Sequence, residues 1–428
     1  MKKLNIAIIG LGNIGSYLFK YLNENKRKLT EKNNCIPIIK YVSAKSKNKK
    51  RNIRIKRSQW LKNYIDATKI DDVDLIVELI GGAEGPAKKL VFNALKNKKH
   101  VITANKALIA KYGDQLSLIA EKNKVNLEFE ASVCGGVPII RSLKEGLIAN
   151  KISKIYGIFN GTSNYILSSM DKQNKDFNMV LSNAKKLGYA ESNPSADLNG
   201  DDVSSKLKIL SSLCFNSFLN NNIYVEGINH IEKVDIENAN NLGYKIKLLG
   251  FAELINNKIY QRVHPTLIKK ESYVASIDGV QNAVIIDGRP VGQSIIQGEG
   301  AGPSATTSAL VSDISSILRG NVKFPFSLSS KKRKRLKFEN ISNRFFSAYL
   351  RFEVLDKQGV LSNITKIFSK NKVSIKRLVQ TPDKNKKISS IVIITHKSKD
   401  AFLNKIVKEV TKKNYIKSKL KLIRIDDI

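Results

Sequence analysis

The chain has 428 residues, which corresponds to roughly three domains of about 150 residues each, so a single compact core is excluded. Hydrophobic residues make up 42% and charged residues 26%, values that are ordinary for globular proteins and that exclude general disorder. The 74 Lys and Arg outnumber the 37 Asp and Glu, for a net charge of +37. Lys and Asn recur together in nearly every predicted loop, which favours a compositional bias at solvated positions over binding of nucleic acid or another polyanion.

The cysteines and the apolar runs indicate the cellular setting. Cys35, Cys134 and Cys214 form no CxxC motif and have no His at metal-ligand spacing, which predicts neither a disulfide nor a zinc site and indicates a reducing, cytoplasmic setting. No cleavage pattern follows the short apolar stretch near the N-terminus, and no run reaches the roughly 18 apolar residues of a membrane span. The densest basic run, Lys331 to Arg335, is predicted to be a solvated linker.

The N-terminal region carries a glycine-rich motif in a specific context. The apolar stretch Leu4 to Ile9 predicts a buried strand, GLGNIG follows it directly, and residues 16 to 22 then have helical spacing. In such a strand-turn-helix unit the glycines allow the tight turn, the approach of a pyrophosphate and close packing of helix on strand. The predicted dinucleotide contacts here are Gly10, Gly12, Asn13, Ile14 and Gly15.

The second predicted strand, Ile36 to Val42, bears on cofactor choice. An NAD enzyme offers Asp or Glu to the ribose hydroxyls after this strand, whereas here the run SAKSK follows it. A cationic site without an acid favours the 2′-phosphate of NADP(H), with Lys45 as the expected contact. Because Lys is common throughout the chain, NAD(H) remains open.

Two further apolar segments fit a parallel sheet. Leu75 to Ile80 ends in Gly81 and Gly82, and Val101 to Thr103 ends in a loop that contains Lys106. Loops at the carboxyl ends of parallel strands face the cofactor, so Gly81 is a further predicted contact. Lys106 has the right place to reach the nicotinamide or phosphate region, although a lysine by itself is weak evidence in so basic a chain.

Acidic residues concentrate between Gly188 and Leu210, against the basic trend of the chain. The pattern from Asp202 onward predicts a helix, which places Asp202 and Lys206 four residues apart on one face. The simple interpretation is a helix ion pair that contributes roughly a few tenths of a kcal/mol, and spacing alone favours it. The alternative is that Asp202 orients Lys206 to exchange a proton with an alcohol oxygen, while Glu191 and Asp197 bind a substrate ammonium group.

Together these segments resemble the homoserine dehydrogenase family, whose members interconvert aspartate 4-semialdehyde and homoserine with NAD(P)H. The shared motifs run in one order over about residues 1 to 320: GLGNIG, VELIGG, HVITANKALIA, FEASVCGGVPII, NGTSNYIL, GYAE with DLNGDDVSSK, and GEGAGPSATTSALVSD. The resemblance implies an oxidoreductase of threonine, methionine and isoleucine biosynthesis, with L-aspartate 4-semialdehyde and L-homoserine as its substrate pair.

The resemblance also implies a role for each matching residue. Lys206 is similar to the family's acid/base lysine, Asp202 to the acid that accompanies it, and Lys106 to a lysine at the cofactor and reaction centre. Glu191 matches the glutamate that binds the amino acid. The other implied substrate contacts are Asp197, Gly161, Thr162 and Gly188, and the other implied cofactor contacts are Gly300 and Gly302.

The segment EASVCGGVP resembles the family's monovalent cation loop, which usually holds sodium. The implied ligands are the carboxylate or backbone oxygens of Glu130, Val133, Gly135 and Val137, and hard oxygen ligands suit such an ion. Cys134 lies inside this loop. A thiol nucleophile, as in aspartate-semialdehyde dehydrogenase, would need a His partner, and none is evident nearby, so Cys134 is expected to be a loop residue.

The region after the basic run has its own pattern. It predicts the order βαββαβ, with segments at 349–355, 360–369, 373–379, 389–395, 402–411 and 420–425. This order and the turn DKQGVLSNI resemble an ACT domain, a module that binds amino acids and often pairs between chains. The resemblance implies feedback by threonine through Gly359 and neighbouring backbone groups. The alternative is that the module only supports oligomerisation.

We therefore expect an α/β protein with a Rossmann-type doubly wound parallel sheet over 1–135, rejoined by about 298–320, and a central α/β catalytic and dimerisation domain over 136–297. A basic linker over 321–346 and a ferredoxin-like ACT domain over 347–428 complete the expected organisation. The protein is expected to form a homodimer or homotetramer and to bind neither nucleic acid nor membrane. The competing hypothesis is a non-catalytic NADP-binding sensor, which would leave Glu191, Asp202 and Lys206 without a purpose.

Overall fold

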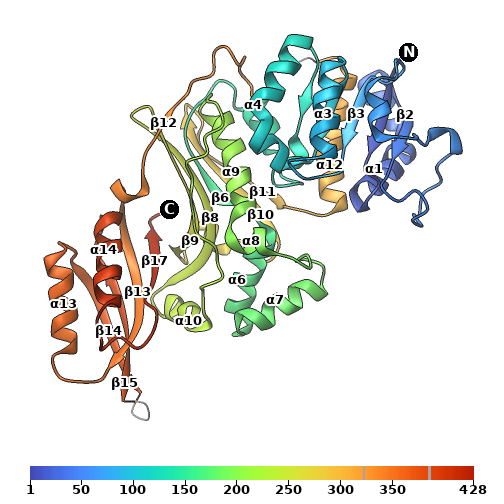
Figure 1. The fold of residues 1–428 in the computed structure, drawn as a ribbon. Coiled ribbons are helices and arrows are strands. Elements are labelled where there is room, and N and C mark those ends of the chain that lie inside the picture. The colour runs from blue at the N-terminus through green and yellow to red at the C-terminus, as the bar shows by residue number, and fades with distance from the viewer. Residues whose placement is uncertain (322, 384–386) are drawn as a thin grey trace.

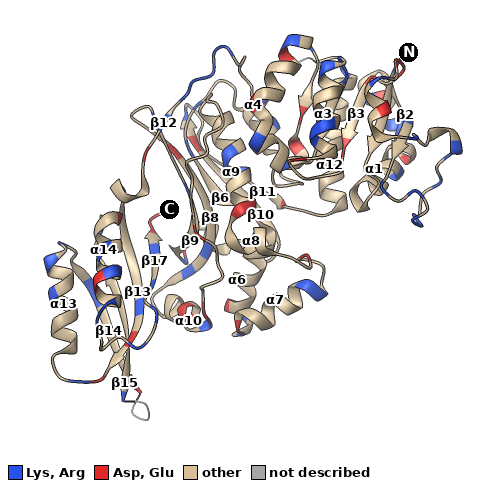
Figure 2. Cartoon of the chain, viewed as in Figure 1, with Lys and Arg blue, Asp and Glu red and all other residues tan. Residues whose placement is uncertain are grey.

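The computed structural model describes residues 1–321, 323–383 and 387–428. Figure 1 shows an N-terminal domain in blue and cyan, a central domain in green and yellow, and a C-terminal domain in orange and red at the opposite end of the molecule. Figure 2 shows Lys and Arg on all three domains instead of on one of them. In the described part of the chain, no helix is both long and apolar enough to cross a membrane.

The N-terminal domain is built on a parallel five-stranded sheet with the order β2-β1-β3-β4-β5. The strands are β1 (Lys2–Ile9), β2 (Cys35–Ser43), β3 (Leu75–Glu78), β4 (His100–Thr103) and β5 (Leu127–Glu128). The helices are α1 (Asn13–Glu24), α2 (Lys26–Asn33), α3 (Pro86–Lys96) and α4 (Lys106–Asn123). The strands are runs of apolar residues because helices cover both faces of the sheet. The predicted Rossmann-type sheet is confirmed.

A distant segment completes this domain. Helix α12 (Pro303–Leu318) lies among the blue and cyan elements in Figure 1, and its apolar side chains join the core that contains Leu18 of α1. The buried residues Leu310 and Ile314 provide this contact. The chain therefore leaves the N-terminal domain after β5 and returns to it after the central domain.

The central domain consists of antiparallel strands with helices packed against them. The strands are β6 (Lys151–Ile158), β8 (Tyr244–Ile255), β9 (Lys258–Lys269), β10 (Gln281–Arg289) and β11 (Gly292–Glu299), in the order β11-β10-β6-β8-β9. The helices are α6 (Gly161–Gln173), α7 (Phe177–Lys186), α8 (Ser195–Asn199), α9 (Asp201–Cys214) and α10 (Lys233–Asn241). Helices α6 and α9 contact β8, so the buried faces of both helices meet the sheet.

The C-terminal domain has the predicted βαββαβ order, and this part of the predicted fold is confirmed. Its elements are β13 (Phe345–Leu355), α13 (Val360–Lys370), β14 (Ile375–Asp383), β15 (Ile388–Thr395), α14 (Asp400–Thr411) and β17 (Lys421–Asp426). Strand β17 also pairs in parallel with β9, so the sheets of the central and C-terminal domains are continuous.

Short helices and strands lie between the elements named above. They are η1 (Arg57–Gln59), η2 (Tyr64–Thr68), η3 (Glu130–Ser132), α5 (Ile139–Arg141), η4 (Ser142–Gly146), β7 (Tyr224–Val225), α11 (Tyr273–Ser276), β12 (Lys337–Phe338), η5 (Ile341–Asn343) and β16 (Ser398–Lys399).

The prediction of a solvated linker is wrong at Arg333. Its side chain is buried, and its guanidinium donates to Asp114 Oδ1 at 2.7 Å and to the Ser217 carbonyl at 2.7 Å. The same group stacks on Phe326 at 4.3 Å. A run of five basic residues looks solvated as a block, whereas one of them here joins α4 of the N-terminal domain to the loop after α9. Residue 322 of the predicted linker lies outside the described residues.

Candidate active site

The candidate site lies where the first turns of α4 and α9 meet, between the N-terminal and central domains. Lys106 begins α4, Asp202 is the second residue of α9, and Lys206 follows one turn later. The Asp202 carboxylate lies 2.8 Å from Lys206 Nζ through Oδ2 and 2.8 Å from Lys106 Nζ through Oδ1. One buried carboxylate thus joins two ammonium groups from different domains.

Asn160 organises the acidic side of the site. Its side chain caps α6 by accepting a hydrogen bond from the Ser163 amide at 2.7 Å. Its Nδ2 donates to Asp197 Oδ1 at 2.7 Å and to Asp202 Oδ2 at 2.9 Å, so it joins both carboxylates. Asn160 was not among the residues predicted from the sequence. An Asn directly before a helix is a recognisable capping signal, but no helix was predicted to follow it.

The charges of the site follow from these contacts. Burial alone would raise the pKa of Asp202, but the ammonium groups of Lys206 and Lys106 outweigh it and hold this pKa well below its usual range. Burial alone would lower the pKa of Lys206, but the Asp202 carboxylate outweighs it, so the pKa of Lys206 is raised. Burial also raises the pKa of Asp197. At neutral pH Lys206 is therefore a charged ammonium, which is the form that gives up a proton.

The Lys206 ammonium has one N–H group to spare. It donates to Asp202 and to the Phe159 carbonyl at 2.6 Å, and no third acceptor lies within reach among residues 1–321, 323–383 and 387–428. An ammonium has three N–H donors. The third N–H is available to a substrate oxygen.

The other predicted substrate residues lie around α6 and the loop after α7. Gly161 and Thr162 begin α6, and the Thr162 hydroxyl donates to the Tyr189 carbonyl at 2.6 Å. Gly188 has a φ of 75°, which favours glycine. Glu191 is exposed in the same loop, and the described residues provide no hydrogen bond or ion pair that joins it to Asp202. Gly161 and Thr162 thus directly follow Asn160, whereas the loop of Glu191 is joined to α6 through the Thr162 hydrogen bond to Tyr189.

The glycine-rich loop has the geometry of a dinucleotide site. A Cβ at Gly10 would lie 2.4 Å from a backbone oxygen, and a Cβ at Gly15 would lie 2.0 Å from the Gly10 oxygen, so only glycine fits at these two positions. A Cβ at Gly12 would meet nothing within 4 Å, so this face of the loop is open. No side chain caps the start of α1, which leaves its first N–H groups, near Asn13 and Ile14, for an anion.

An arginine that our sequence analysis missed lies beside this loop. Arg51 donates through Nε to the Leu11 carbonyl at 2.9 Å, within the glycine-rich motif, and its guanidinium lies 5.8 Å from the Trp60 ring. The predicted phosphate contact, Lys45, is exposed two residues beyond β2. The neighbouring Lys47 also lies over Trp60, at 5.5 Å. Sequence spacing gave no reason to bring Arg51 back to the loop, because the intervening residues have no regular pattern.

The remaining predicted cofactor glycines lie in loops between elements. Gly81 follows β3 and donates its N–H to Glu78 Oε1 at 2.9 Å. Gly302 precedes α12 with a φ of 109°. Gly300 lies against Gly135, where an added Cβ would be 2.8 Å from the Gly300 oxygen. The predicted cation loop and the predicted cofactor loop are therefore in direct contact.

The cation loop presents oxygen atoms suited to a monovalent ion. The Glu130 carboxylate is buried and accepts two backbone N–H groups at 2.9 and 2.6 Å, and burial raises its pKa to about 7. Among the described residues, no donor reaches the carbonyl oxygens of Val133 and Gly135, whereas the Val137 carbonyl accepts a backbone N–H at 2.7 Å. No group of three or more His, Cys, Asp or Glu suited to a metal occurs in the described chain. Carboxylate and carbonyl oxygens are ligands that hard cations prefer, so these residues could hold the predicted ion.

Cys134 is not an activated thiol. It is fully buried, and burial raises its pKa to about 11. A nucleophilic cysteine requires a lowered pKa and access to the substrate. Its expected place as a loop residue agrees with both observations.

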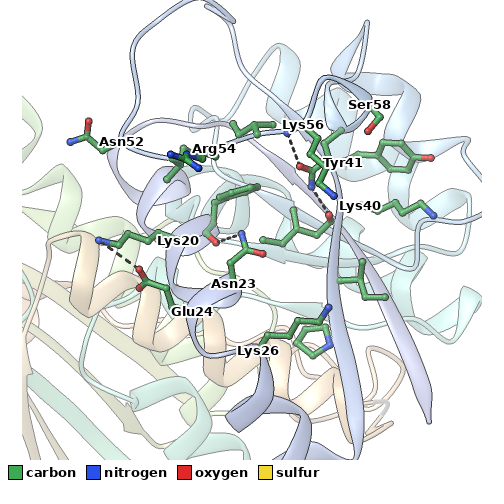
Figure 3. Close-up of a pocket in the computed structure, with 17 residues that line it drawn as sticks. Lys20, Asn23, Glu24, Lys26, Lys40, Tyr41, Asn52, Arg54, Lys56 and Ser58 are labelled. Carbon is green, nitrogen blue, oxygen red and sulfur yellow. Dashed lines mark hydrogen bonds and ion pairs between the residues drawn. The ribbon is translucent and has the colours of Figure 1, made fainter.

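A cavity of about 1000 Å³ lies away from this chemistry (Figure 3). It is bounded by α1, the outer edge of β2 and residues 52–59, with Lys20, Lys40, Arg54 and Lys56 among its lining side chains. Neither Asp202 nor either of its lysine partners contributes to it.

Comparison with known proteins provides the family. A homoserine dehydrogenase of Neisseria gonorrhoeae is 36% identical, and the alignment covers 100% of both chains. One of Bacillus subtilis is 35% identical over 96% of this chain and 95% of its own. The chain belongs to the homoserine dehydrogenase family.

Family models and solved structures agree with this assignment to the homoserine dehydrogenases. The model of the homoserine dehydrogenase NAD binding domain matches residues 10–130, that of homoserine dehydrogenase matches 138–315, and that of an AHAS small subunit-like ACT domain matches 350–416. The crystal structure of a homoserine dehydrogenase from Thiobacillus denitrificans has a TM-score of 0.92 at 34% identity and covers 100% of this chain and 99% of its own. The family predicted from the ordered motifs is confirmed, and the chain is an NAD(P)-dependent oxidoreductase acting on a CH–OH group.

Proposed function

We propose that this homoserine dehydrogenase reduces L-aspartate 4-semialdehyde to L-homoserine with Lys206 as the proton donor. The single observation that carries the proposal is the Asp202 carboxylate shared by Lys206 and Lys106 at the junction of the two domains. A helix ion pair alone would need neither the lysine from the other domain nor the spare N–H of Lys206. The simpler interpretation of the Asp202 and Lys206 spacing is therefore incomplete.

Lys206 acts as a general acid. A bound nicotinamide supplies the hydride that forms the new C–H bond at the aldehyde carbon. Lys206 transfers a proton from Nζ to the carbonyl oxygen as negative charge develops there, and the product is an alcohol. Asp202 keeps Lys206 charged and oriented before this step. In the reverse direction the neutral Lys206 amine accepts the hydroxyl proton.

The substrate ammonium is held by carboxylates. Glu191 and Asp197 are the proposed partners, and Asn160 supports Asp197 through its hydrogen bond. The backbone at Gly161, Thr162 and Gly188 forms the remaining substrate surface. Glu191 lies in an exposed loop, and the described residues provide no hydrogen bond or ion pair for its side chain, which suits a residue that meets its partner only when substrate binds.

NADP(H) is the proposed cofactor, with NAD(H) as a weaker alternative. Gly10, Gly12 and Gly15 would hold the pyrophosphate against α1. No acid stands at the end of β2, and Lys45 and Arg51 supply positive charge for a 2′-phosphate. A hyperthermophilic archaeal homoserine dehydrogenase solved in complex with NADPH is 25% identical, covers 73% of this chain and 97% of its own, and has a TM-score of 0.63.

A structural sodium ion is proposed for the loop at Glu130, Val133, Gly135 and Val137. The support is the pair of buried carbonyl oxygens that accept no hydrogen bond from the described residues, together with the contact of this loop with Gly300. Such an ion would fix the loop against the cofactor side of the site. It would take no part in proton transfer.

The C-terminal ACT domain is proposed to sense an amino acid, with threonine as the first candidate effector. Gly359 is in the left-handed conformation directly before α13, and α13 has no side-chain cap. The free N–H groups of this first turn suit a carboxylate. We further propose a cytoplasmic homodimer or homotetramer.

The deciding experiment measures NADPH oxidation at 340 nm with aspartate semialdehyde, in a buffer that contains sodium, for the unaltered chain and for Lys206→Met. Parallel runs with NADH, without sodium and with added threonine test the cofactor, ion and effector. Turnover that is lost in the variant supports the proposed mechanism. NADPH binding without turnover in the unaltered chain would favour the non-catalytic sensor.

A further inference from the structure

Asn282, on β10, is a buried polar residue that none of the roles above requires. It is fully buried, and an amide placed in an apolar interior costs free energy unless it is hydrogen-bonded. Its partners therefore show what its presence achieves.

The Asn282 amide and the Lys206 ammonium donate to the same backbone carbonyl. Its Nδ2 donates to the Phe159 carbonyl at 3.1 Å, and the same carbonyl accepts the Lys206 N–H at 2.6 Å. The Phe159 carbonyl thus has two donors, one from the reacting lysine and one from a neutral side chain on another strand. A carbonyl held by Asn282 has a fixed position for its bond to Lys206.

Close packing and the position of the amide oxygen fix the orientation of the Asn282 amide. A Cβ at Gly300 would lie only 2.2 Å from Asn282 Cγ, so the backbone there packs directly on the amide. The Oδ1 atom has no hydrogen-bond partner among the described residues. Rotating the amide by half a turn would place that oxygen against the Phe159 carbonyl oxygen, where two acceptors repel each other. The observed orientation therefore keeps the N–H on the carbonyl.

We propose that Asn282 is a positioning residue: by holding the Phe159 carbonyl it directs the third N–H of Lys206 toward the substrate oxygen. This inference rests on the proposed function of Lys206. The lysine has three donors, two of which are fixed by Asp202 and Phe159. If the carbonyl moves, the ammonium rotates with it and the free N–H no longer points along one direction.

The test compares Asn282→Leu with Asn126→Leu. Both replace a buried asparagine by a side chain of similar size, and Asn126 lies in the N-terminal domain with its amide donating to the Asn321 carbonyl at 2.6 Å. Asn282→Leu is expected to lower kcat by about 10- to 100-fold, because small displacements of a reacting group have effects of this size. The KM for NADPH is expected to stay within about twofold, since no cofactor contact is removed. Asn126→Leu is expected to leave kcat unchanged.

A solvent isotope measurement separates positioning from stability. A misdirected Lys206 slows proton transfer, so the solvent deuterium isotope effect on kcat is expected to rise in Asn282→Leu but not in Asn126→Leu. Asn282→Asp keeps the shape of the side chain while removing the N–H donors, and it replaces the Leu variant if that protein does not fold. Its kcat is expected to fall to a similar extent.

The outcomes distinguish this inference from the proposed function. No turnover by the unaltered chain would overturn both. Turnover by the unaltered chain, together with a folded Asn282→Leu that has unchanged kcat and isotope effect, would overturn only the role of Asn282. If neither Asn282 variant folds, the residue serves the fold and the inference is wrong.

Discussion

Two buried lysines of the central domain, Lys206 and Lys247, form ion pairs of similar length with different consequences. Each lies 2.8 Å from an aspartate oxygen, of Asp202 and of Asp278. Lys247 also donates to Asn164 Oδ1 at 3.1 Å and to the Ile277 carbonyl, which uses all three of its N–H groups. Lys206 uses two. The number of N–H groups with acceptors among the described residues, and not burial or pairing, therefore distinguishes Lys247 from the lysine that is proposed to meet a substrate.

The pKa values of the two lysines shift in opposite directions. Burial lowers the pKa of Lys247 more strongly than Asp278 raises it. At Lys206 the balance is reversed, because Asp202 is itself held ionised by Lys106 as well as by Lys206. The Asp202 carboxylate, which both ammonium groups hold ionised, thus keeps Lys206 charged.

Of the variants that test this comparison of the two lysines, Lys206→Met is expected to have the largest effect on kcat. This change removes the proton donor while keeping most of the side-chain volume. We expect kcat to fall by roughly 10²- to 10⁴-fold, the usual contribution of a positioned acid, with little change in the thermal midpoint. Steady-state kinetics and circular dichroism melting check this. If Lys206→Met is folded and its kcat lies within about threefold of the unaltered value, Lys206 is not the proton donor.

Asp202→Asn is expected to have the next largest effect. The amide has nearly the same shape but no charge, so burial acts on Lys206 without its main opposing charge, and the pKa of Lys206 falls. We expect a kcat loss of about 10- to 100-fold at neutral pH. Activity in the reductive direction is also expected to decline at a lower pH than in the unaltered chain. A pH profile of kcat/KM for both proteins measures this displacement, and coincident profiles would mean that Asp202 does not control the charge of Lys206.

The unaltered chain should show opposite pH dependences in the two directions. Reduction needs the ammonium form of Lys206, which persists below its raised pKa, so kcat/KM should be flat through neutral pH and decline only in strongly alkaline solution. Oxidation of homoserine needs the neutral amine. Its kcat/KM should therefore rise by about tenfold per pH unit through the neutral range. Equal slopes in both directions would exclude Lys206 as the only titrating acid/base group.

Lys247→Met should have the smallest effect on chemistry. The variant leaves Asn164 Oδ1 without its donor, while Asp278 keeps Lys172 at 3.0 Å. We expect the free energy of unfolding to drop by about 1–3 kcal/mol, the cost of a buried polar atom without a partner, with kcat unchanged at a temperature where the protein is folded. Urea unfolding and kinetics on the same sample test this, and a large loss of kcat would remove the distinction between the two lysines.

The parts of the site that the sequence predicted depend on local spacing. The first strand and the GLGNIG turn are adjacent in the sequence, and Asp202 and Lys206 are four residues apart. In each case local strand or helix geometry fixes how the residues lie relative to one another. Lys106 came from a family resemblance, because its contact with Asp202 joins residues that are far apart in the chain. The functional roles of all these residues remain predictions.

The missed features have a common physical cause. Arg51, Asn160 and Asn282 act through backbone carbonyls or through side chains of other elements, and a one-dimensional pattern does not mark such acceptors. The carbonyl of Phe159 has no signature in the sequence at all. At Arg333 a prediction was wrong instead of missing. The basic run around it predicted exposure to solvent, whereas its partners Asp114 and Ser217 lie in other segments of the chain and hold its side chain in the interior.

The parallel pairing of β17 with β9 has a consequence for the order of events during synthesis. Strand β9 leaves the ribosome long before residues 421–426 are synthesised. During this interval its backbone from Thr266 to Ile268 has not yet paired with β17. Such an uncovered strand edge can pair with the wrong segment or with another nascent chain. The ACT domain therefore covers the edge strand β9 of the central domain's sheet. Slow translation of the last domain would lengthen the interval in which the nascent chain is prone to aggregate.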